Sequence, residues 1–383
     1  MNTILQTKTR RTREKSLMKA NIIQMLSNVA LSASLVFIPN LAKQLGAELE
    51  IGVIGAVYGL AVFTSSYIFG RAADIYDRKT IIRLGLLFST VTFFLQALTD
   101  PYFVAPLWAS PLLLAVARIL VGFSLGMFPP ALIAHVYESR RPLGRFTGFG
   151  ALGWSIGTLT AGLIAFYWGV FIFSSACLLL AFLISLTLPD IGKLKLKIPF
   201  FPRDLLKKNW HVYLPFFLRH SGANCIWIIY PLYIESLGGD KFWIGALYTI
   251  NTLTQFVVMQ FMERPKGKIL LNIGLIFSIT TFMLISLAQN FLHLIPAQII
   301  LGTSWSCMYV GSLIYLMRHN VEKSTSGGIL GSLTSLAMVF GSLIGGTLSG
   351  LFGFRVTMYT AAGLTLVGFL LFQLSNRKNQ IMD

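Results

Sequence analysis

Three ionisable side chains lie inside long apolar stretches of the chain, where their chemistry is hydrogen bonding and anion binding. Arg219 and His220 lie well inside one such stretch, and Arg118 lies within another. A charged group in a long apolar segment is costly, so each is a candidate functional residue. Arginine presents five N–H donors in a planar fork that suits carboxylates and other planar anions. These residues predict recognition of an anionic or strongly hydrogen-bonding group.

Further polar and aromatic residues share helical faces within the apolar stretches. The spacings i, i+3, i+7 and i, i+4, i+7 place on single faces Asn21, Gln24 and Asn28, and His220, Asn224 and Trp227. Two more pairs are spaced i, i+4: Trp305 with Tyr309, and Asn251 with Gln255. Amide side chains also bond neighbouring membrane helices, so each Asn or Gln has a packing role as its alternative.

The sequence lacks the patterns that most enzymes use. It contains no HExxH, no GxSxG, no Cys/His cluster and no paired carboxylates within an apolar stretch. Cys177, Cys225 and Cys307 are far apart in apolar segments and are interpreted as small hydrophobic residues. We therefore expect a protein that is not an enzyme and that has no catalytic residues, metal site or cofactor.

The composition indicates a membrane protein. Hydrophobic residues make up 55% of the chain and charged residues 12%, about half the charged share of soluble domains. A spanning helix needs about 20 mostly apolar residues. That rule predicts an all-α membrane protein with twelve transmembrane helices, near 17–43, 51–72, 80–99, 111–137, 146–168, 169–188, 210–235, 242–262, 268–289, 292–319, 327–351 and 353–375. The joints at Tyr167-Trp168-Gly169 and Phe352-Gly353-Phe354 each require a turn.

The distribution of Lys and Arg predicts the orientation, because short cytoplasmic loops carry an excess of both. With both termini in the cytoplasm, the outer connections hold only Lys43, Lys241 and Arg355. The inner segments hold the N-terminal cluster from Lys8 to Lys15 and Arg78, Lys79, Arg83, Arg140, Arg141, Arg145, Lys193, Lys195, Lys197, Arg203, Lys207, Lys208, Arg264, Lys266, Lys268, Arg318, Lys323, Arg377 and Lys378. The net charge of +17 is thus explained by topology and by attraction to anionic lipid, without a nucleic-acid partner.

The two halves of the chain resemble each other in sequence. Pro39 and Pro231 each lie seven residues before a glycine, and an Ile-Gly pair follows in both halves. GWSIGTLTAG from Gly153 likewise matches GSLIGGTLSG from Gly341 at a similar offset. The repeat equates the seventh helix with the first, so that His220 and Asn28 occupy equivalent positions. Both lie about ten residues, or ~15 Å, from the predicted inner end of their helix, near the midplane.

One loop and two helices resemble signatures of the major facilitator superfamily. GRAADIYDRK, from Gly70 to Lys79, resembles its G-x-x-x-D-[RK]-x-G-[RK]-[RK] loop, although Ile75 and Asp77 depart from it. LAVARILVGFSLG resembles its R-x-x-x-G signature on helix four, and GWSIGTLTAG a degenerate form of the glycine-rich motif on helix five. With the spans and the repeat, the resemblance covers nearly the whole chain.

The resemblance implies a secondary transporter that works by alternating access between two pseudo-symmetric six-helix bundles. The expected segments are a basic N-terminal segment 1–16, a first bundle 17–188, a cytoplasmic linker 189–209, a second bundle 210–375 and a tail 376–383. Helices one, four, seven and ten line the cavity in this family. The expected binding residues, with one from helix eight, are then Asn28, Arg118, Arg219, His220, Asn224, Trp227, Asn251, Trp305 and Tyr309.

The loop between helices two and three predicts a conformational latch. Asp74 should end helix two where helix eleven begins with Ser324-Thr325-Ser326, and a helix N-terminus stabilises a carboxylate. Arg78 with Glu138 would form a second link. The latch residues are therefore Gly70, Asp74, Arg78, Lys79 and Glu138, with solvated loop charges as the alternative.

The substrate is expected to be a small molecule, either an organic anion or a polar metabolite. All fourteen acidic residues fall at predicted helix ends, loops or termini, so no carboxylate is available as a proton carrier. A coupled proton would use His220. Export of amphiphilic, drug-like compounds is the alternative within transport, because Phe, Met and Trp make adaptable pockets. A non-transporting membrane sensor or scaffold is the alternative of another class. The expected location is a multi-pass position in the plasma or inner membrane.

Overall fold

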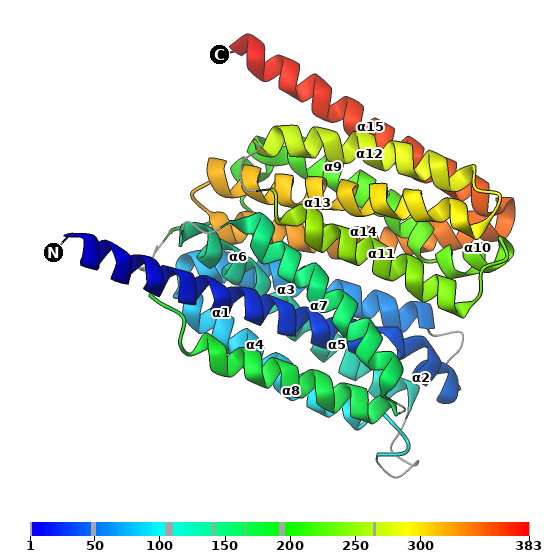
Figure 1. Ribbon diagram of the computed structural model, residues 1–383, viewed down its shortest axis with the longest axis horizontal. Coiled ribbons are helices and arrows are strands. Elements are labelled where there is room, and N and C mark those ends of the chain that lie inside the picture. The colour runs from blue at the N-terminus through cyan, green and yellow to red at the C-terminus, as the bar shows by residue number, and fades with distance from the viewer. Residues whose placement is uncertain are drawn as a thin grey trace. The chain divides into compact units, whose positions relative to one another are not determined.

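A computed structural model of the protein describes residues 2–46, 51–103, 110–139, 142–164, 166–190, 196–262 and 266–382. Every regular element in these ranges is a helix (Figure 1). The elements are α1 (Asn2–Val36), α2 (Ile38–Gln44), α3 (Ile51–Ile75), α4 (Arg78–Ala97), α5 (Pro111–Met127), α6 (Pro129–Glu138), α7 (Leu143–Leu163), α8 (Tyr167–Ser185), α9 (Arg203–Trp227), α10 (Tyr230–Ser236), α11 (Lys241–Met259), α12 (Gly267–Ser286), the 3-10 helix η1 (Phe291–His293), α13 (Leu294–His319), α14 (Lys323–Phe352) and α15 (Phe354–Met382).

Ten segments of the described chain are long and apolar enough to cross a membrane. The other two predicted spans, 146–168 and 210–235, correspond to α7 and to α9 with α10. These helices have the required length, but glycine and threonine in α7 and the charged first turns of α9 make them less apolar. The chain is an all-helical, multi-pass membrane protein, and the count of twelve spans stays a prediction.

Three predicted spans are broken by proline. Pro39, Pro129 and Pro231 each occupy the first or second position of a new helix, α2, α6 and α10. Proline lacks the N–H that a continuing helix needs but fits the first turn of a helix, where that N–H has no partner. Apolar length alone predicts continuous helices here, and the prolines account for the difference.

One of the two predicted turns is confirmed. Gly353 separates α14 from α15 with a φ of 81°, a left-handed conformation that glycine adopts without strain. The turn predicted at Tyr167-Trp168-Gly169 is wrong, because α7 ends at Leu163 and α8 already begins at Tyr167. Gly169 lies inside α8 and continues the helix.

The described chain forms two compact units. The first comprises residues 1–197 and 322–329, and the second comprises 198–321 and 330–383. In the first, α1 packs on α7 and α8, and α4 packs on α5 and α8 (Figure 1). In the second, α12 packs on α13 and α15, and α9 packs on α15. The chain passes between the units inside the predicted linker 189–209, while the boundaries of the two predicted bundles stay predictions.

Glycines mediate matching close approaches in the two units. A Cβ on Gly157 of α7 would overlap with the carbonyl oxygen of Val29 in α1. A Cβ on Gly345 of α14 would overlap in the same way with the carbonyl oxygen of Cys225 in α9. Gly85 and Gly274 similarly face Phe128 and Met308. The internal repeat seen in sequence therefore has a counterpart in packing.

The packing corrects the register of that repeat by one helical turn. Gly153 faces Asn28, and its counterpart Gly341 faces Asn224 rather than His220. The hydrogen bonds agree, because the Asn28 amide donates to the Gln24 carbonyl and the Asn224 amide donates to the His220 carbonyl, each at 2.8 Å. His220 is thus equivalent to Gln24. The alignment on prolines gave a different register because Pro39 lies eleven residues after Asn28, whereas Pro231 lies only seven residues after Asn224.

Candidate functional site

Asp74, in the last turn of α3, is fully buried and bonded to the first turn of α14 within the first unit. Its two carboxylate oxygens accept the backbone N–H groups of Ser324 at 3.1 Å and Thr325 at 2.8 Å, and the Thr325 hydroxyl at 2.9 Å. These N–H groups belong to the first turn of the helix and have no partner within it. The carboxylate therefore caps α14 and is stabilised by the positive end of its dipole.

Arg78, the first residue of α4, extends this network. Its guanidinium donates to Asp74 at 2.8 Å and to the Ser324 hydroxyl at 2.9 Å, and it forms a salt bridge with Glu138 at the end of α6. The Nζ atom of Lys323 lies 3.7 Å from the other oxygen of Glu138. Two carboxylates and two cations thus tie the ends of α3, α4 and α6 to the start of α14.

Gly70 allows the backbones in this region to meet. A Cβ on Gly70 would lie 2.8 Å from Gly328 Cα and 2.8 Å from the Ser324 carbonyl oxygen. In turn, a Cβ on Gly328 would overlap with the carbonyl oxygen of Ser66. Any larger side chain at Gly70 would push α14 away from Asp74.

Two neighbouring residues of the signature loop have other partners. Lys79 does not join the network; its Nζ lies 3.8 Å from an oxygen of Asp190. Asp77, which departs from the family pattern, accepts the Thr80 N–H at 3.1 Å and its hydroxyl at 2.8 Å as the N-cap of α4. The departure therefore has a local reason, because aspartate is a favoured N-cap.

Arg219 is buried inside the second unit. Its Nε donates to the Ser278 hydroxyl at 2.7 Å and its Nη2 to the Ser304 hydroxyl at 3.2 Å. The rings of Phe282 and Trp305 lie 5.7 Å and 5.6 Å from its guanidinium carbon. No carboxylate pairs with it among the described residues. The guanidinium bridges α9, α12 and α13 through serines that sequence reasoning missed.

His220, one residue further along α9, joins an aromatic stack that is only partly buried. Its ring stacks on Trp305 with centroids 4.8 Å apart, and Trp305 stacks on Tyr309 at 5.1 Å. Phe216 packs against all three rings. The structure thus brings together the predicted residues His220, Trp305 and Tyr309 in one array.

The remaining predicted residues of the second unit lie further along. Trp227 packs on Tyr248 with ring centroids 5.0 Å apart. The Asn251 side chain donates to the Gln298 carbonyl at 3.2 Å and accepts from Gln255 at 2.7 Å. These contacts favour helix packing for Asn251, the alternative that its sequence position left open.

In the first unit, Arg118 is buried without a carboxylate partner among the described residues. Its guanidinium carbon lies 4.0 Å from the centroid of the Tyr58 ring, a cation–π geometry. Its Nε and Nη1 atoms have no hydrogen-bond partner in the described part of the chain. Asn28 lies apart, on the face of α1 that packs on α7. Arg118 is therefore the most poorly compensated of the predicted ionisable residues.

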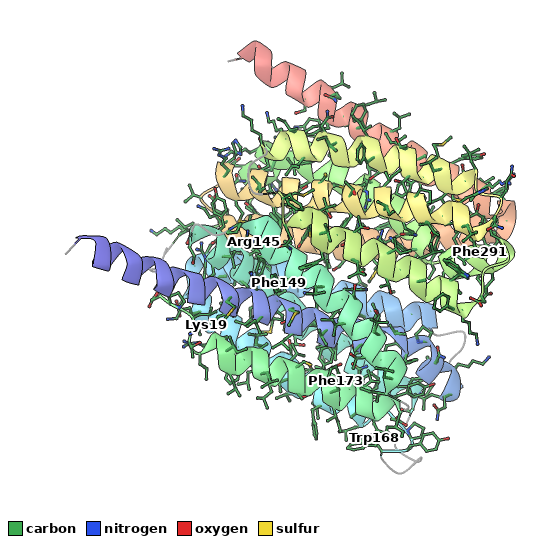
Figure 2. All side chains as sticks on the ribbon, in the orientation of Figure 1. Lys19, Arg145, Phe149, Trp168, Phe173 and Phe291 are labelled. Atoms are coloured by element: carbon green, nitrogen blue, oxygen red, sulfur yellow. The ribbon has the colours of Figure 1, made fainter. Side chains whose placement is uncertain are left out.

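The charged and aromatic ends of the first unit are distinct. Lys19 and Arg145 lie toward one end of its helices, and Trp168 lies at the opposite end (Figure 2). The Asp100 carboxylate accepts a hydrogen bond from the backbone N–H of Trp168 at 2.9 Å. The two fully buried acidic residues of the described chain, Asp74 and Asp100, thus both lie at helix ends.

The predicted inner residues Arg140, Arg141, Lys193, Lys195 and Arg264 lie outside the described residues.

The comparisons with known proteins identify the family. The Major Facilitator Superfamily model matches residues 20–327 and 216–380, so the chain belongs to that superfamily of transporters. It is similar to "Multidrug resistance protein 1" of Bacillus subtilis (25% identity over 78% of this chain and 80% of that protein). It is also similar to "Quinolone resistance protein NorA" of Staphylococcus aureus (24% identity over 87% and 89%).

Solved structures share the fold. The human organic anion transporter MFSD10 (TETRAN) matches with a TM-score of 0.79 and 16% identity, over 94% of this chain and 99% of that one. The nucleoside transporter NupG, in a mutant form, matches with a TM-score of 0.64 and 15% identity over the same shares. The chain is a secondary transporter of this superfamily, and its substrates are small molecules.

Proposed function

We propose that this transporter carries an organic anion and that Arg118 binds the anionic group. The observation that carries the proposal is a buried guanidinium with two nitrogen atoms unpaired and no carboxylate beside it among the described residues. A buried charge is stable only when it is paired or hydrogen-bonded. A carboxylate on the substrate would supply the missing acceptors in bidentate form.

Arg219 has a different part in this proposal. Its Nε and Nη2 atoms already donate to Ser278 and Ser304, and its guanidinium lies between helices of one unit. It holds α9, α12 and α13 together. The partly exposed stack of His220, Trp305 and Tyr309 is the better candidate for contact with substrate, and His220 is the group that a proton-coupled cycle would use.

Export of amphiphilic compounds is the second candidate function. It is favoured by the aromatic stack and by the relatives named for multidrug and quinolone resistance. Organic anions with aromatic rings satisfy both candidates, whereas lipophilic cations suit only the second. The deciding question is therefore whether the substrate needs a negative charge.

The network around Asp74 is proposed to act as the latch of alternating access. It holds the first turn of α14 in the first unit, although the rest of α14 belongs to the second. Breaking it in one step of the cycle would release that turn.

The proposal also includes cytoplasmic termini, a plasma-membrane location and the absence of enzymatic activity.

A thermal-shift experiment tests the substrate class, because a ligand stabilises the folded state that it binds. Purified protein is heated with aromatic carboxylates or with lipophilic cations, as wild type, Arg118→Gln and Arg355→Gln. Arg355 is an exposed arginine and serves as the control. We expect a carboxylate to raise the Tm of wild type and Arg355→Gln but not of Arg118→Gln. Stabilisation by cations alone, unchanged in Arg118→Gln, would replace the anion proposal with export of cationic amphiphiles.

A further inference from the structure

Corresponding positions of the two units contain Arg118 and a residue that sequence reasoning passed over, Gln298. A Cβ on Gly122 of α5 would lie 2.6 Å from the Tyr58 carbonyl oxygen, and one on Gly302 of α13 would lie 2.7 Å from the Asn251 carbonyl oxygen. The two glycines are therefore equivalent in packing.

Four residues before each glycine, one turn earlier on the same helix face, stand Arg118 and Gln298. Each contacts the residue that its glycine faces: Arg118 lies over the Tyr58 ring, and the Gln298 carbonyl accepts from Asn251. Gln298 is the counterpart of Arg118 in the second unit.

The side chain of Gln298 has the same deficiency as that of Arg118. It is fully buried, and neither its Oε1 nor its Nε2 atom makes a hydrogen bond of normal geometry within the described chain, although the Tyr230 hydroxyl lies beside it. An unsatisfied buried polar group costs about 1–3 kcal/mol. A leucine would fill this place without that cost, so the amide retains a donor and an acceptor that a ligand could use.

Gln298 is one of the residues that line a small aromatic pocket inside the second unit. The lining residues are Ala223, Ile226, Trp227, Tyr230, Phe282, Ile285, Gln298 and Leu301. Tyr230 lies beside Gln298, and its buried hydroxyl interacts with the Gln298 side chain without reaching normal hydrogen-bond geometry. None of the lining residues is charged. The lining thus combines three aromatic side chains, one of them the phenol of Tyr230, with one glutamine.

The pocket lies where α9 breaks and α10 begins, between Trp227 and Tyr230. In this conformation the space between these side chains is too small for a ligand. A broken helix is a usual place for binding and movement in transporters. Opening at this break would admit a ligand between Trp227 and Phe282 and bring its polar group to Gln298.

We propose that Gln298 is the hydrogen-bonding residue of a binding subsite for a planar aromatic group that bears a carbonyl or hydroxyl substituent. The aromatic side chains pack on the ring, while the amide donates to the carbonyl or accepts from the hydroxyl. The inference rests on the proposed transport function for its role in the cycle. It concerns the second unit alone, and neutral ligands test it.

A pair of matched ligands tests this subsite. The probes are 4-quinolone, a neutral bicyclic ring with a carbonyl, and quinoline, the ring system without it. Dissociation constants are measured by calorimetry for wild type, Gln298→Leu and Gln96→Leu. Gln96 is the control because it is also fully buried with both amide atoms unpaired, but it lies in α4 of the first unit, outside the pocket.

We expect Gln298→Leu to weaken 4-quinolone binding about tenfold, the worth of one good hydrogen bond, and to leave quinoline binding unchanged. Gln96→Leu should change neither. Equal 4-quinolone affinity in wild type and Gln298→Leu would overturn the inference, as would equal losses for both ligands or no binding to wild type. Gln298→Met, which keeps the side-chain length, repeats the test if leucine disturbs packing.

A third ligand separates this inference from the proposed function. Arg118→Gln should weaken binding of 4-quinolone-3-carboxylate but not of neutral 4-quinolone. If the carboxylate is unaffected by Arg118→Gln while Gln298→Leu still discriminates the neutral pair, the anion proposal fails and the subsite stands.

Discussion

At the scale of single residues, Asp74 illustrates what sequence can predict about a site. Its position at the end of an apolar stretch and the Ser-Thr-Ser start of another predicted their contact, which the hydrogen bonds to Ser324 and Thr325 display. No sequence signal marks Lys323 or Gly328, because their part depends on the angle at which two distant helices meet. Gln298 was missed because a lone glutamine in an apolar helix looks like ordinary packing.

Replacing Asp74 by Asn should impair transport without preventing membrane insertion. The amide loses the charge that pairs with Arg78, and its NH₂ group would face an N–H donor of α14. Charge-assisted bonds of this kind are worth about 1.5–3 kcal/mol each, so we expect at least a tenfold fall in uptake rate in proteoliposomes. Asp77→Asn is the matched control, because Asn caps a helix as well as Asp. Wild-type uptake in Asp74→Asn would exclude the latch.

Replacing Arg219 by Met should leave anion binding intact. The serines that Arg219 contacts also bond to each other and to the Gly274 carbonyl, so they keep partners when the guanidinium is removed. Exchange of a buried charge for an apolar side chain of similar volume is often neutral or stabilising. The check is the carboxylate-induced rise in Tm, which should match wild type. Loss of that rise, as expected for Arg118→Gln, would place Arg219 in the binding site.

At the scale of elements, apolar length predicted the existence of the helices but not their breaks. Pro129 could have divided 111–137, since a proline inside a predicted helix ends or kinks it. The turn before Tyr167 could not be located, because apolar residues continue across it and positions 164–166 contain neither proline nor glycine. The glycine motifs of α7 and α14 are sites of close helix approach. Their partners follow only from packing, as the shift from His220 to Asn224 opposite Gly341 shows.

Two adjacent glycines of α14 should respond oppositely to alanine. Gly345→Ala would place a Cβ against the backbone of Cys225, and overpacking of this kind costs about 1–3 kcal/mol. Gly346→Ala meets no atom within 4 Å and should gain up to about 1 kcal/mol of helix propensity. The Tm of the purified variants measures the difference. Equal values for the two would show that α14 does not pack on α9 through Gly345.

At the scale of the whole molecule, the repeat and the asymmetry of Lys and Arg are the two predictions that concern the entire chain. The repeat appears in both units as equivalent glycine contacts, including Gly157 with Gly345 and Gly85 with Gly274. The asymmetry of Lys and Arg predicts which ends of the helices face the cytoplasm. That direction depends on the membrane and on insertion, so the contacts of the folded chain leave it a prediction.

Single-cysteine labelling on intact cells should reveal that direction. Ser236, at the end of α10, belongs to a predicted outer connection, and Thr187, after α8, lies at the inner end of the predicted span 169–188, next to the linker. Both are exposed, and each hydroxyl bonds a carbonyl three residues earlier, so cysteine should disturb them equally little. The native Cys177, Cys225 and Cys307 are buried and serve as the background. We expect a membrane-impermeant maleimide to label Ser236→Cys in intact cells and Thr187→Cys only after permeabilisation. The reverse pattern would mean that the Lys- and Arg-rich ends face outward, so that the network at Asp74 closes the external side.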